Sequence, residues 1–221
     1  MPPPAPNTCW LYLVRHGATA NNAARPPRLQ GRRTDPALSD EGLQEARCTA
    51  ERLAELPIDA VFASPLLRAR QTAEAMARSH GLTIQVLNEL VEVDVGDWEG
   101  RAWNEIQRTD GEAYRLFMTD ASLHGYLGGE NLATVQARVI PAFEQLMAAY
   151  CGRLIVAVAH NVVNRAYLAH LLGAPLRNYR SIPQDNCGVN LIRRRDGKIK
   201  LITVNQLFVG TPGTPGSGRE Q

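Results

Sequence analysis

Two histidines in the chain each follow a short apolar segment. His16 comes after Arg15 at the end of CWLYLV (residues 9–14), and His160 directly follows LIVAVA (residues 154–159). Both segments are continuous and contain aromatic or β-branched residues, as expected for strands that are buried on both faces. A polar residue at such a strand end often only begins a turn. Two histidines at the ends of what are expected to be neighbouring strands favour a shared functional site over two separate turns.

Arginines near these histidines indicate recognition of an anion. Arg15 is adjacent to His16, and Arg68 falls in the first turns of a helix expected after the apolar segment AVFA (residues 60–63). The guanidinium fork matches the oxygens of a phosphate, and a helix N-terminus adds backbone donors. Arginine by itself is weak evidence here, because the 24 basic residues include only two lysines. Together with the paired histidines, phosphate binding is the better interpretation.

A carboxyl group for proton transfer is available in the acidic stretch ELVEVDVGDWE (residues 89–99). A run of carboxylates is usually a solvated surface and occasionally binds a divalent cation. No His-Glu-x-x-His motif or cysteine–histidine cluster accompanies it, so we expect no metal. One carboxyl placed in the same crevice could work as a general acid and base. The cysteines are too dispersed for a metal or redox motif and are expected to be reduced: Cys9, Cys48, Cys151 and Cys187.

The elements that must position these groups alternate between strands and helices. Further strands are predicted at residues 84–87, 189–193 and 199–204, and the last two can pair across the turn Asp196-Gly197. Helical patterns occupy residues 39–56, 65–80, 131–150 and 161–172. This alternation predicts an α/β fold, a three-layer αβα sandwich with a mostly parallel sheet. In such a fold, ligands bind beyond the carboxyl ends of the strands.

The length of 221 residues suits a single domain, which we place at residues 9–209. The polar and less periodic stretch from about 100 to 129 is long enough to form a lid over the site. Residues 1–8 and 210–221 are rich in Pro, Gly, Ser and Thr, and are expected to be flexible tails.

The composition excludes several classes of protein. With 44% apolar and 21% charged residues, wholesale disorder is excluded. The 24 basic and 22 acidic residues leave a formal charge of +2, which gives no electrostatic footprint for nucleic acid or an anionic membrane. No apolar run approaches the length of about 18 residues that a transmembrane helix needs, and the N-terminal residues lack the pattern of a signal peptide. We therefore expect a cytoplasmic protein.

The sequence resembles the histidine phosphatase superfamily, in its phosphoglycerate-mutase-like branch (branch 1). The resemblance starts from Arg15-His16-Gly17, which looks like the family's RHG motif, and it extends in the family's order from about residue 10 to 205. One triplet is weak evidence, whereas several blocks in the family's order are strong. The other matching segments are Ala18-Thr19 with Asn22; Gln30-Gly31 with Asp35-Pro36-Ala37-Leu38 and Gly42; Ser64-Pro65-Leu66 with Arg68-Ala69-Arg70-Gln71-Thr72-Ala73; Glu92 with Gly96-Asp97-Trp98-Glu99-Gly100; Gly129-Glu130; and Ala159-His160.

The resemblance implies a phosphoglycerate-mutase-like fold and phosphoryl transfer without a metal or organic cofactor. His16 would be the nucleophile that becomes phosphohistidine. Arg15, Arg68 and His160 would surround the three non-bridging oxygens of the phosphoryl group, and Asn22 would add a neutral donor. The remaining positions expected to bind substrate are Gln30, Gly31 and Asn161.

The position that matches the family's proton donor is Glu92, with Glu89 as the alternative. This carboxyl would protonate the leaving alkoxide and then deprotonate the water that cleaves phosphohistidine, a role that needs a pKa raised by burial. Two positions depart from the family pattern, Ala18 after the RHG motif and Asn161 after His160, and both are expected at the rim of the pocket.

The function expected from these features is hydrolysis of a small phosphomonoester by a phosphoric monoester hydrolase. The candidate substrates are sugar phosphates, phosphoglycerate-like acids and a nucleoside phosphate such as α-ribazole phosphate. A phosphomutase remains the alternative, but it typically needs a larger lid, and Arg101, Arg108 and Arg115 in the expected lid are scattered. A non-catalytic phospholigand-binding protein and a protein-phosphohistidine phosphatase also remain open. We expect a small phosphorylated metabolite as partner, with no nucleic acid or membrane, and leave a homodimer open.

Overall fold

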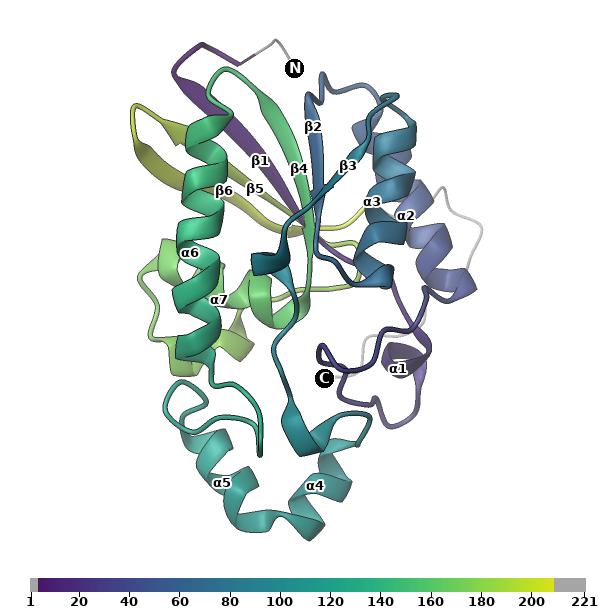
Figure 1. Cartoon of the computed structure of the whole chain (residues 1–221), viewed down its shortest axis with the longest axis vertical. Coiled ribbons are helices and arrows are strands. Elements are labelled where there is room, and N and C mark those ends of the chain that lie inside the picture. The colour runs from purple at the N-terminus through teal and green to yellow at the C-terminus, as the bar shows by residue number, and fades with distance from the viewer. Residues whose placement is uncertain (1–3, 209–221) are drawn as a thin grey trace.

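A central six-stranded sheet organises the molecule, for which a computed structural model describes residues 4–208 (Figure 1). The strand order is β3-β2-β4-β1-β5-β6. The strands span Thr8–Arg15 (β1), Ala60–Ala63 (β2), Ile84–Val86 (β3), Leu154–Ala159 (β4), Val189–Arg195 (β5) and Lys198–Gln206 (β6).

The four strands β3, β2, β4 and β1 are parallel, and β5 and β6 join β1 in antiparallel pairing. Asp196 and Gly197, which connect β5 to β6, have φ angles of 50° and 77°. Positive φ at both central residues is the geometry that matches the twist of a two-residue hairpin. The α/β class, the mostly parallel sheet and this hairpin are confirmed.

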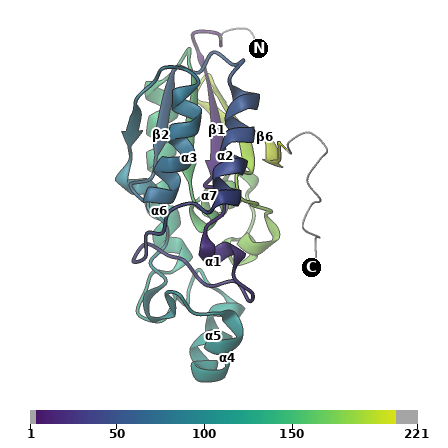
Figure 2. The ribbon, with the colours of Figure 1, turned by 90° about the vertical axis from the view of Figure 1, so that its right-hand side faces the viewer.

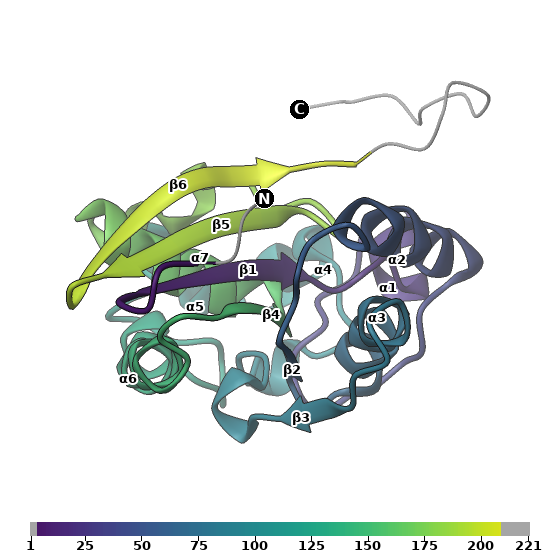
Figure 3. The same ribbon diagram turned by 90° about the horizontal axis from the view of Figure 1, so that it is seen from above.

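Helices cover both faces of the sheet, as Figure 3 shows from above for α2 and α3 on one side and α6 on the other. The α-helices span Ala20–Ala23 (α1), Asp40–Leu53 (α2), Leu67–Arg78 (α3), Trp103–Thr109 (α4), Gly111–Thr119 (α5), Leu132–Ala149 (α6) and Asn161–Leu172 (α7). Short 3₁₀ turns span Asn88–Leu90 (η1), Gly96–Trp98 (η2) and Leu176–Ser181 (η3).

Side chains of the central strands alternate between two cores. In β1, Leu11 and Leu13 pack in the core beneath α6 and α7, whereas Tyr12 and Val14 pack in the core beneath α2 and α3. Every residue of β4 is buried. A strand that is covered on both faces has a continuous run of apolar residues in its sequence, because neither face is exposed to water. This is why β1 and β4 could be recognised from the sequence.

Two predicted helices are shorter than their apolar patterns. The α2 helix ends at Leu53 rather than residue 56, since Leu56 precedes Pro57 and a residue before proline avoids helical geometry. The α3 helix begins at Leu67 rather than residue 65, because Leu66 has the extended conformation of an N-cap. Ser39 caps α2 as predicted, accepting a hydrogen bond from the Gly42 amide at 3.2 Å.

A cap formed by α4 and α5 extends beyond the carboxyl ends of the parallel strands (Figures 1 and 2). It packs through a cluster of aromatic rings around Trp98, which is fully buried and contacts Trp103, Phe117 and Tyr126 edge-on. These rings join the cap to the larger of the hydrophobic clusters beside the sheet. None of the helices in residues 4–208 combines the length and apolar character needed to cross a membrane. The predicted C-terminal tail lies outside the described residues.

Candidate active site

The carboxyl ends of β1 and β4 bring the two strand-end histidines together. The strands pair in parallel, with Arg15 opposite Ala159, and the His16 amide donates to the Ala159 carbonyl at 3.0 Å. The ring centroids of His16 and His160 are 5.1 Å apart, at an interplanar angle of 59°. The expectation that these histidines lie on neighbouring strands is confirmed.

His16 is held as a neutral base. Its side chain is only 3% exposed, and Nδ1 lies 2.7 Å from the Gly17 carbonyl oxygen. Because a carbonyl only accepts, Nδ1 carries the proton and Nε2 keeps its lone pair. Burial lowers the pKa of His16 well below its usual value, and the charges of Arg15 and Arg68 lower it further. The imidazole is therefore uncharged at neutral pH and can act as a nucleophile through Nε2.

Gly17 allows the turn after β1 to pack closely on α2. A Cβ atom on Gly17 would lie 2.5 Å from the carbonyl oxygen of Gly42, so a larger residue would push these segments apart. The Gly17 amide donates to Thr72 Oγ1 at 3.0 Å, which joins the turn to α3. These contacts fix the carbonyl that sets the tautomer of His16.

His160 is oriented by Ser64, at the end of β2. His160 Nε2 lies 2.7 Å from Ser64 Oγ, which also accepts from the Leu66 amide at 3.4 Å. The serine hydroxyl can donate to Nε2 while it accepts from that amide, and in this tautomer the ring proton of His160 lies on Nδ1. Nδ1 is buried and has no hydrogen-bond partner among the described residues.

Arg68 is fully buried in the first turn of α3. Its Nη1 donates to the Thr34 carbonyl at 3.1 Å, its Nη2 donates to the Gly31 carbonyl at 2.8 Å, and Asp35 lies 3.7 Å away. Glu99, which sequence reasoning left in the acidic run, accepts from the Gly31 amide at 2.8 Å and holds this loop. Gly31 thus positions Arg68 through its carbonyl and is not on the pocket wall.

Three buried donors point to an anion site. Within residues 4–208, the Nε atoms of Arg15 and Arg68 and the Nδ1 atom of His160 are all buried without a hydrogen-bond partner. The charges of both arginines lower the pKa of His16 and of His160, after the larger effect of burial, so the groups lie close together. Buried donors are costly when unsatisfied, and a tetrahedral anion would satisfy all three.

Glu92 supplies a buried carboxyl to the same pocket. It lies between η1 and η2, is 3% exposed, and accepts from the amides of Val93 at 2.9 Å and Val162 at 3.3 Å. Burial raises the pKa of Glu92, and these hydrogen bonds and Arg68 offset only part of that effect. Glu89 is exposed and does not line the pocket, so the geometry favours Glu92 over the alternative.

The pocket lined by Arg15, His16 and Glu92 has a volume of about 200 Å³. The predicted residues Arg15, His16, Asn22, Gln30, Glu92 and Asn161 all line it. Asn22 Oδ1 and Gln30 Oε1 both accept from the Thr19 hydroxyl, at 3.1 and 2.7 Å. Arg68 and His160 are fully buried and do not contribute to its wall. Ala18, expected at the rim, is buried, and its amide donates to Glu45.

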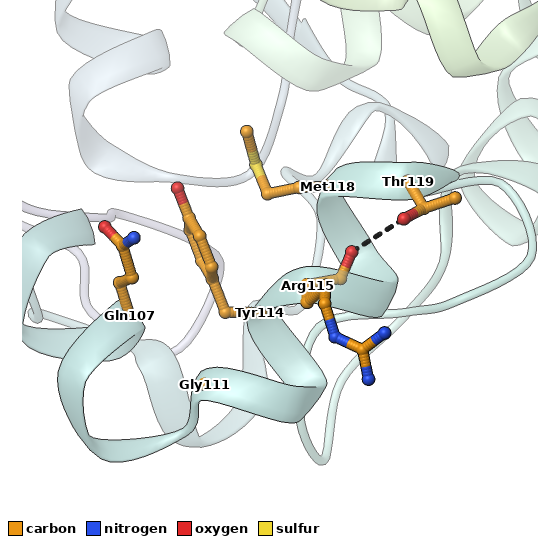
Figure 4. Close-up of a pocket in the computed structure, with 6 residues that line it drawn as sticks. All are labelled: Gln107, Gly111, Tyr114, Arg115, Met118 and Thr119. Atoms are coloured by element: carbon orange, nitrogen blue, oxygen red, sulfur yellow. Dashed lines mark hydrogen bonds between the residues drawn. The ribbon is translucent and has the colours of Figure 1, made fainter.

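Sequence reasoning missed part of the wall, namely Arg28, Trp103, Tyr126, Arg165, Tyr179 and Arg180. Arg165 lies five residues after His160 on α7, a spacing that carried no recognisable motif in an arginine-rich chain. A separate hollow on the cap, lined by α4 and α5 residues, contains Tyr114, Arg115 and Met118 (Figure 4). It holds no histidine or carboxyl side chain, and it shares no lining residue with the pocket around His16.

Known proteins share this architecture. The family profile of the histidine phosphatase superfamily (branch 1) matches residues 11–207. Phosphoserine phosphatase 1 of Hydrogenobacter thermophilus is 30% identical over 88% of this chain and 91% of its own. Phosphoglycerate mutase-like protein 4 of Arabidopsis thaliana is 33% identical over 85% of this chain and 80% of its own.

Solved structures agree with the sequence comparisons. The α-ribazole phosphatase of Shigella flexneri superposes with a TM-score of 0.81 at 25% identity, covering 92% of this chain and 100% of that one. The profile match extends over nearly the whole described chain and includes the strand-end histidines, the Arg68 helix and Glu92. The protein therefore belongs to the histidine phosphatase superfamily, branch 1.

Proposed function

We propose that the protein is a metal-independent phosphatase that hydrolyses a small phosphomonoester through a phosphohistidine on His16. The observation that carries the proposal is the convergence of three unsatisfied buried donors, on Arg15, Arg68 and His160, with a neutral histidine whose Nε2 keeps its lone pair. Glu92, buried in the same pocket, supplies the group for proton transfer.

In the first step, His16 Nε2 attacks the phosphorus atom and the ester P–O bond breaks. The protonated carboxyl of Glu92 gives its proton to the leaving oxygen, so the leaving group departs as an alcohol. The donors of Arg15, Arg68 and His160 bind the three non-bridging oxygens. They are already in place before the reaction, so they stabilise the transferring phosphoryl group with little reorganisation.

In the second step, the Glu92 carboxylate accepts a proton from a water molecule as that water attacks the phosphorus atom. The P–N bond breaks, its electron pair returns to His16 Nε2, and inorganic phosphate leaves. Glu92 is again protonated and His16 is again neutral, so the cycle closes with no change in either group.

One arginine of the cap is not available to hold the second phosphate of a phosphomutase. Arg101 forms ion pairs with Glu105 at 3.2 Å and Asp110 at 2.7 Å, so its charge is already matched within the cap. Two relatives are named phosphoserine phosphatase and α-ribazole phosphatase, and both names denote hydrolysis of a small phosphorylated compound. The pocket volume of about 200 Å³ favours a small phosphorylated metabolite as substrate.

The experiment is hydrolysis of p-nitrophenyl phosphate in excess EDTA by the wild type, His16→Ala and a control, His124→Ala. His124 lies exposed in the segment after α5 and does not line the pocket. We expect turnover by the wild type and the control, and loss of at least about 1000-fold in His16→Ala. Comparable turnover by His16→Ala would contradict the proposal, and dependence of the wild type on added metal would remove its metal-independent part.

A further inference from the structure

The pocket contains more positive charge than one phosphoryl group requires. Its wall carries Arg15, Arg28, Arg165 and Arg180, whereas Glu92 is its single carboxyl residue. Among the described residues, no carboxylate lies within 4.0 Å of the guanidinium groups of Arg28, Arg165 or Arg180. Like charges that face one enclosed space without counter-charges are unfavourable, so their clustering needs an explanation.

Arg165 lies next to the anion site. Its Nε donates to the Ile182 carbonyl at 2.8 Å, which joins α7 to the end of η3 and orients the guanidinium group. After burial, the charge of Arg165 is the largest cause that lowers the pKa of Arg15, to about 10. This hydrogen bond uses only Nε of Arg165. The two terminal nitrogens of the guanidinium group therefore remain available to bind a ligand.

Arg180 lies where the cap meets η3. Its guanidinium carbon is 5.2 Å from the ring centroid of Trp103, 5.1 Å from that of Phe117 and 5.4 Å from that of Tyr179. Contacts of this kind hold a cation in place without neutralising it. Its Nη1 contacts the sulfur of Met118, and its Nη2 is buried with no hydrogen-bond partner in residues 4–208.

The charge of Arg180 also acts on Arg165. Burial lowers the pKa of Arg165, and the nearby charge of Arg180 adds to that effect. Both side chains line the same pocket; a backbone carbonyl holds Arg165 through Nε, and aromatic rings hold Arg180. A small anion between them would satisfy the buried Nη2 and offset both charges.

We propose that Arg165 and Arg180 form a second anion subsite that binds a carboxylate or a second phosphate on the leaving-group part of the substrate. The substrate class is then a small phosphomonoester that carries a further acidic group a few bonds from the phosphorus atom. This subsite rests on the proposed function, because it assumes that the phosphoryl group lies at His16.

The test is ligand binding by calorimetry in the His16→Ala background, where turnover does not interfere. Three ligands share a three-carbon chain and one phosphate ester: glycerol 3-phosphate has no second acid, 3-phosphoglycerate adds a carboxylate, and propane-1,3-diol bisphosphate adds a phosphate. We expect one of the acidic ligands to bind about 10- to 100-fold more tightly than glycerol 3-phosphate, as for charge-assisted hydrogen bonds. Which of the two binds more tightly identifies the second acid.

The variants Arg165→Gln and Arg180→Gln, each added to His16→Ala, should reduce that preference to about threefold or less. Arg177→Gln is the matched control, because Arg177 is an exposed arginine on the same η3 turn. Arg177→Gln should leave the preference unchanged. Thermal unfolding of each variant shows whether it is folded, and two separate arginines keep the test informative if one variant is not.

Equal affinity for all three ligands in the His16→Ala protein would overturn the subsite, as would a preference that survives both Arg165→Gln and Arg180→Gln. Because binding is measured without catalysis, either result is decisive even if the protein shows no phosphatase activity. Conversely, turnover of p-nitrophenyl phosphate that depends on His16, with no preference among the ligands, would support the proposed function and reject the subsite alone.

Discussion

The two ends of the proposed active site, a phosphoryl end and a leaving-group end, are built in different ways. At the phosphoryl end, Arg68 and His160 are fully buried, and backbone carbonyls or a serine hydroxyl hold their other nitrogens. At the leaving-group end, Arg165 and Arg180 are half-buried, and one of them packs on aromatic rings of the cap. The side chains of the first end are held by burial and by hydrogen bonds within the domain, while the position of Arg180 at the second end depends on how the cap and η3 meet.

This difference indicates how chemistry and specificity are divided. The phosphoryl end is formed by β1, β2, β4 and α3, elements that belong to the central sheet or pack directly against it. The leaving-group end draws on α4, α7 and η3, of which η3 contacts α7 and packs through Arg180 on Trp103 of α4. Substitutions at the phosphoryl end should therefore slow every substrate, and substitutions at the other end should change the ranking of substrates.

The largest effect in this comparison is expected from Arg68→Gln. The change removes a buried positive charge from the transferring phosphoryl group, so kcat/KM should fall about 100- to 1000-fold. The loss should be similar for p-nitrophenyl phosphate and for alkyl phosphates, because the interaction is with the part they share. Steady-state kinetics on both types of substrate measure it.

A matched control for Arg68→Gln is Arg70→Gln, two residues later on α3 and exposed. It should change kcat/KM by less than about twofold, as expected for an exposed site. A strong substrate dependence in Arg68→Gln would mean that Arg68 contacts the leaving group, and the division between the two ends would be wrong.

Glu92→Gln should have the next largest effect, and it should depend on the leaving group. Alkyl phosphates need a proton on the departing oxygen, so their kcat/KM should fall about 100-fold, whereas p-nitrophenyl phosphate should lose less than about tenfold. Glu89→Gln, at an exposed neighbouring carboxyl, is the control. Equal losses for both classes would assign Glu92 a structural role.

The same variant should alter the pH dependence. Burial raises the pKa of Glu92, so the protonated acid persists to higher pH than in a solvated glutamate. For alkyl phosphates, kcat/KM should fall as the pH rises through that pKa and also as the pH falls through the lowered pKa of His16. The alkaline decline should be absent in Glu92→Gln, and its persistence there would assign that decline to another group.

A smaller effect is expected from Ser64→Ala. The change removes the hydroxyl that fixes the tautomer of His160, so kcat/KM should fall about tenfold for all substrates. Ser64→Thr keeps a hydroxyl at this position and should recover most of the activity if the β2–α3 turn accommodates the methyl group. Full activity in Ser64→Ala would show that His160 is oriented by its surroundings alone.

The sequence predicted the parts of the site that follow directly from strand ends. His16 and His160 follow continuous apolar segments, and such segments predict strands that are buried on both faces. The parallel pairing of β1 and β4 then places the two histidines side by side. Arg68 could be inferred because it opens a helix after β2. These inferences require only the pattern of apolar residues along the sequence and the rule that ligands bind at the carboxyl ends of the strands of an α/β sheet.

The remaining parts depend on contacts between distant segments. Glu99 resembles its acidic neighbours, and only the approach of the loop at Gly31 shows that it supports Arg68. Arg165 and Arg180 resemble surface arginines in an arginine-rich chain until the fold closes the pocket around them. The early end of α2 could have been predicted, since Pro57 disfavours helical geometry in Leu56.

The central claim is that His16 carries the phosphoryl group, and trapping that intermediate tests it most directly. Wild-type protein would be mixed with a ³²P-labelled phosphomonoester, quenched at alkaline pH within milliseconds, and digested for peptide mapping. We expect acid-labile, alkali-stable label on the peptide that contains His16, increased in Glu92→Gln if hydrolysis of the intermediate becomes rate-limiting. Turnover with no label on that peptide, in both proteins, would contradict the account and indicate direct attack of water on the substrate.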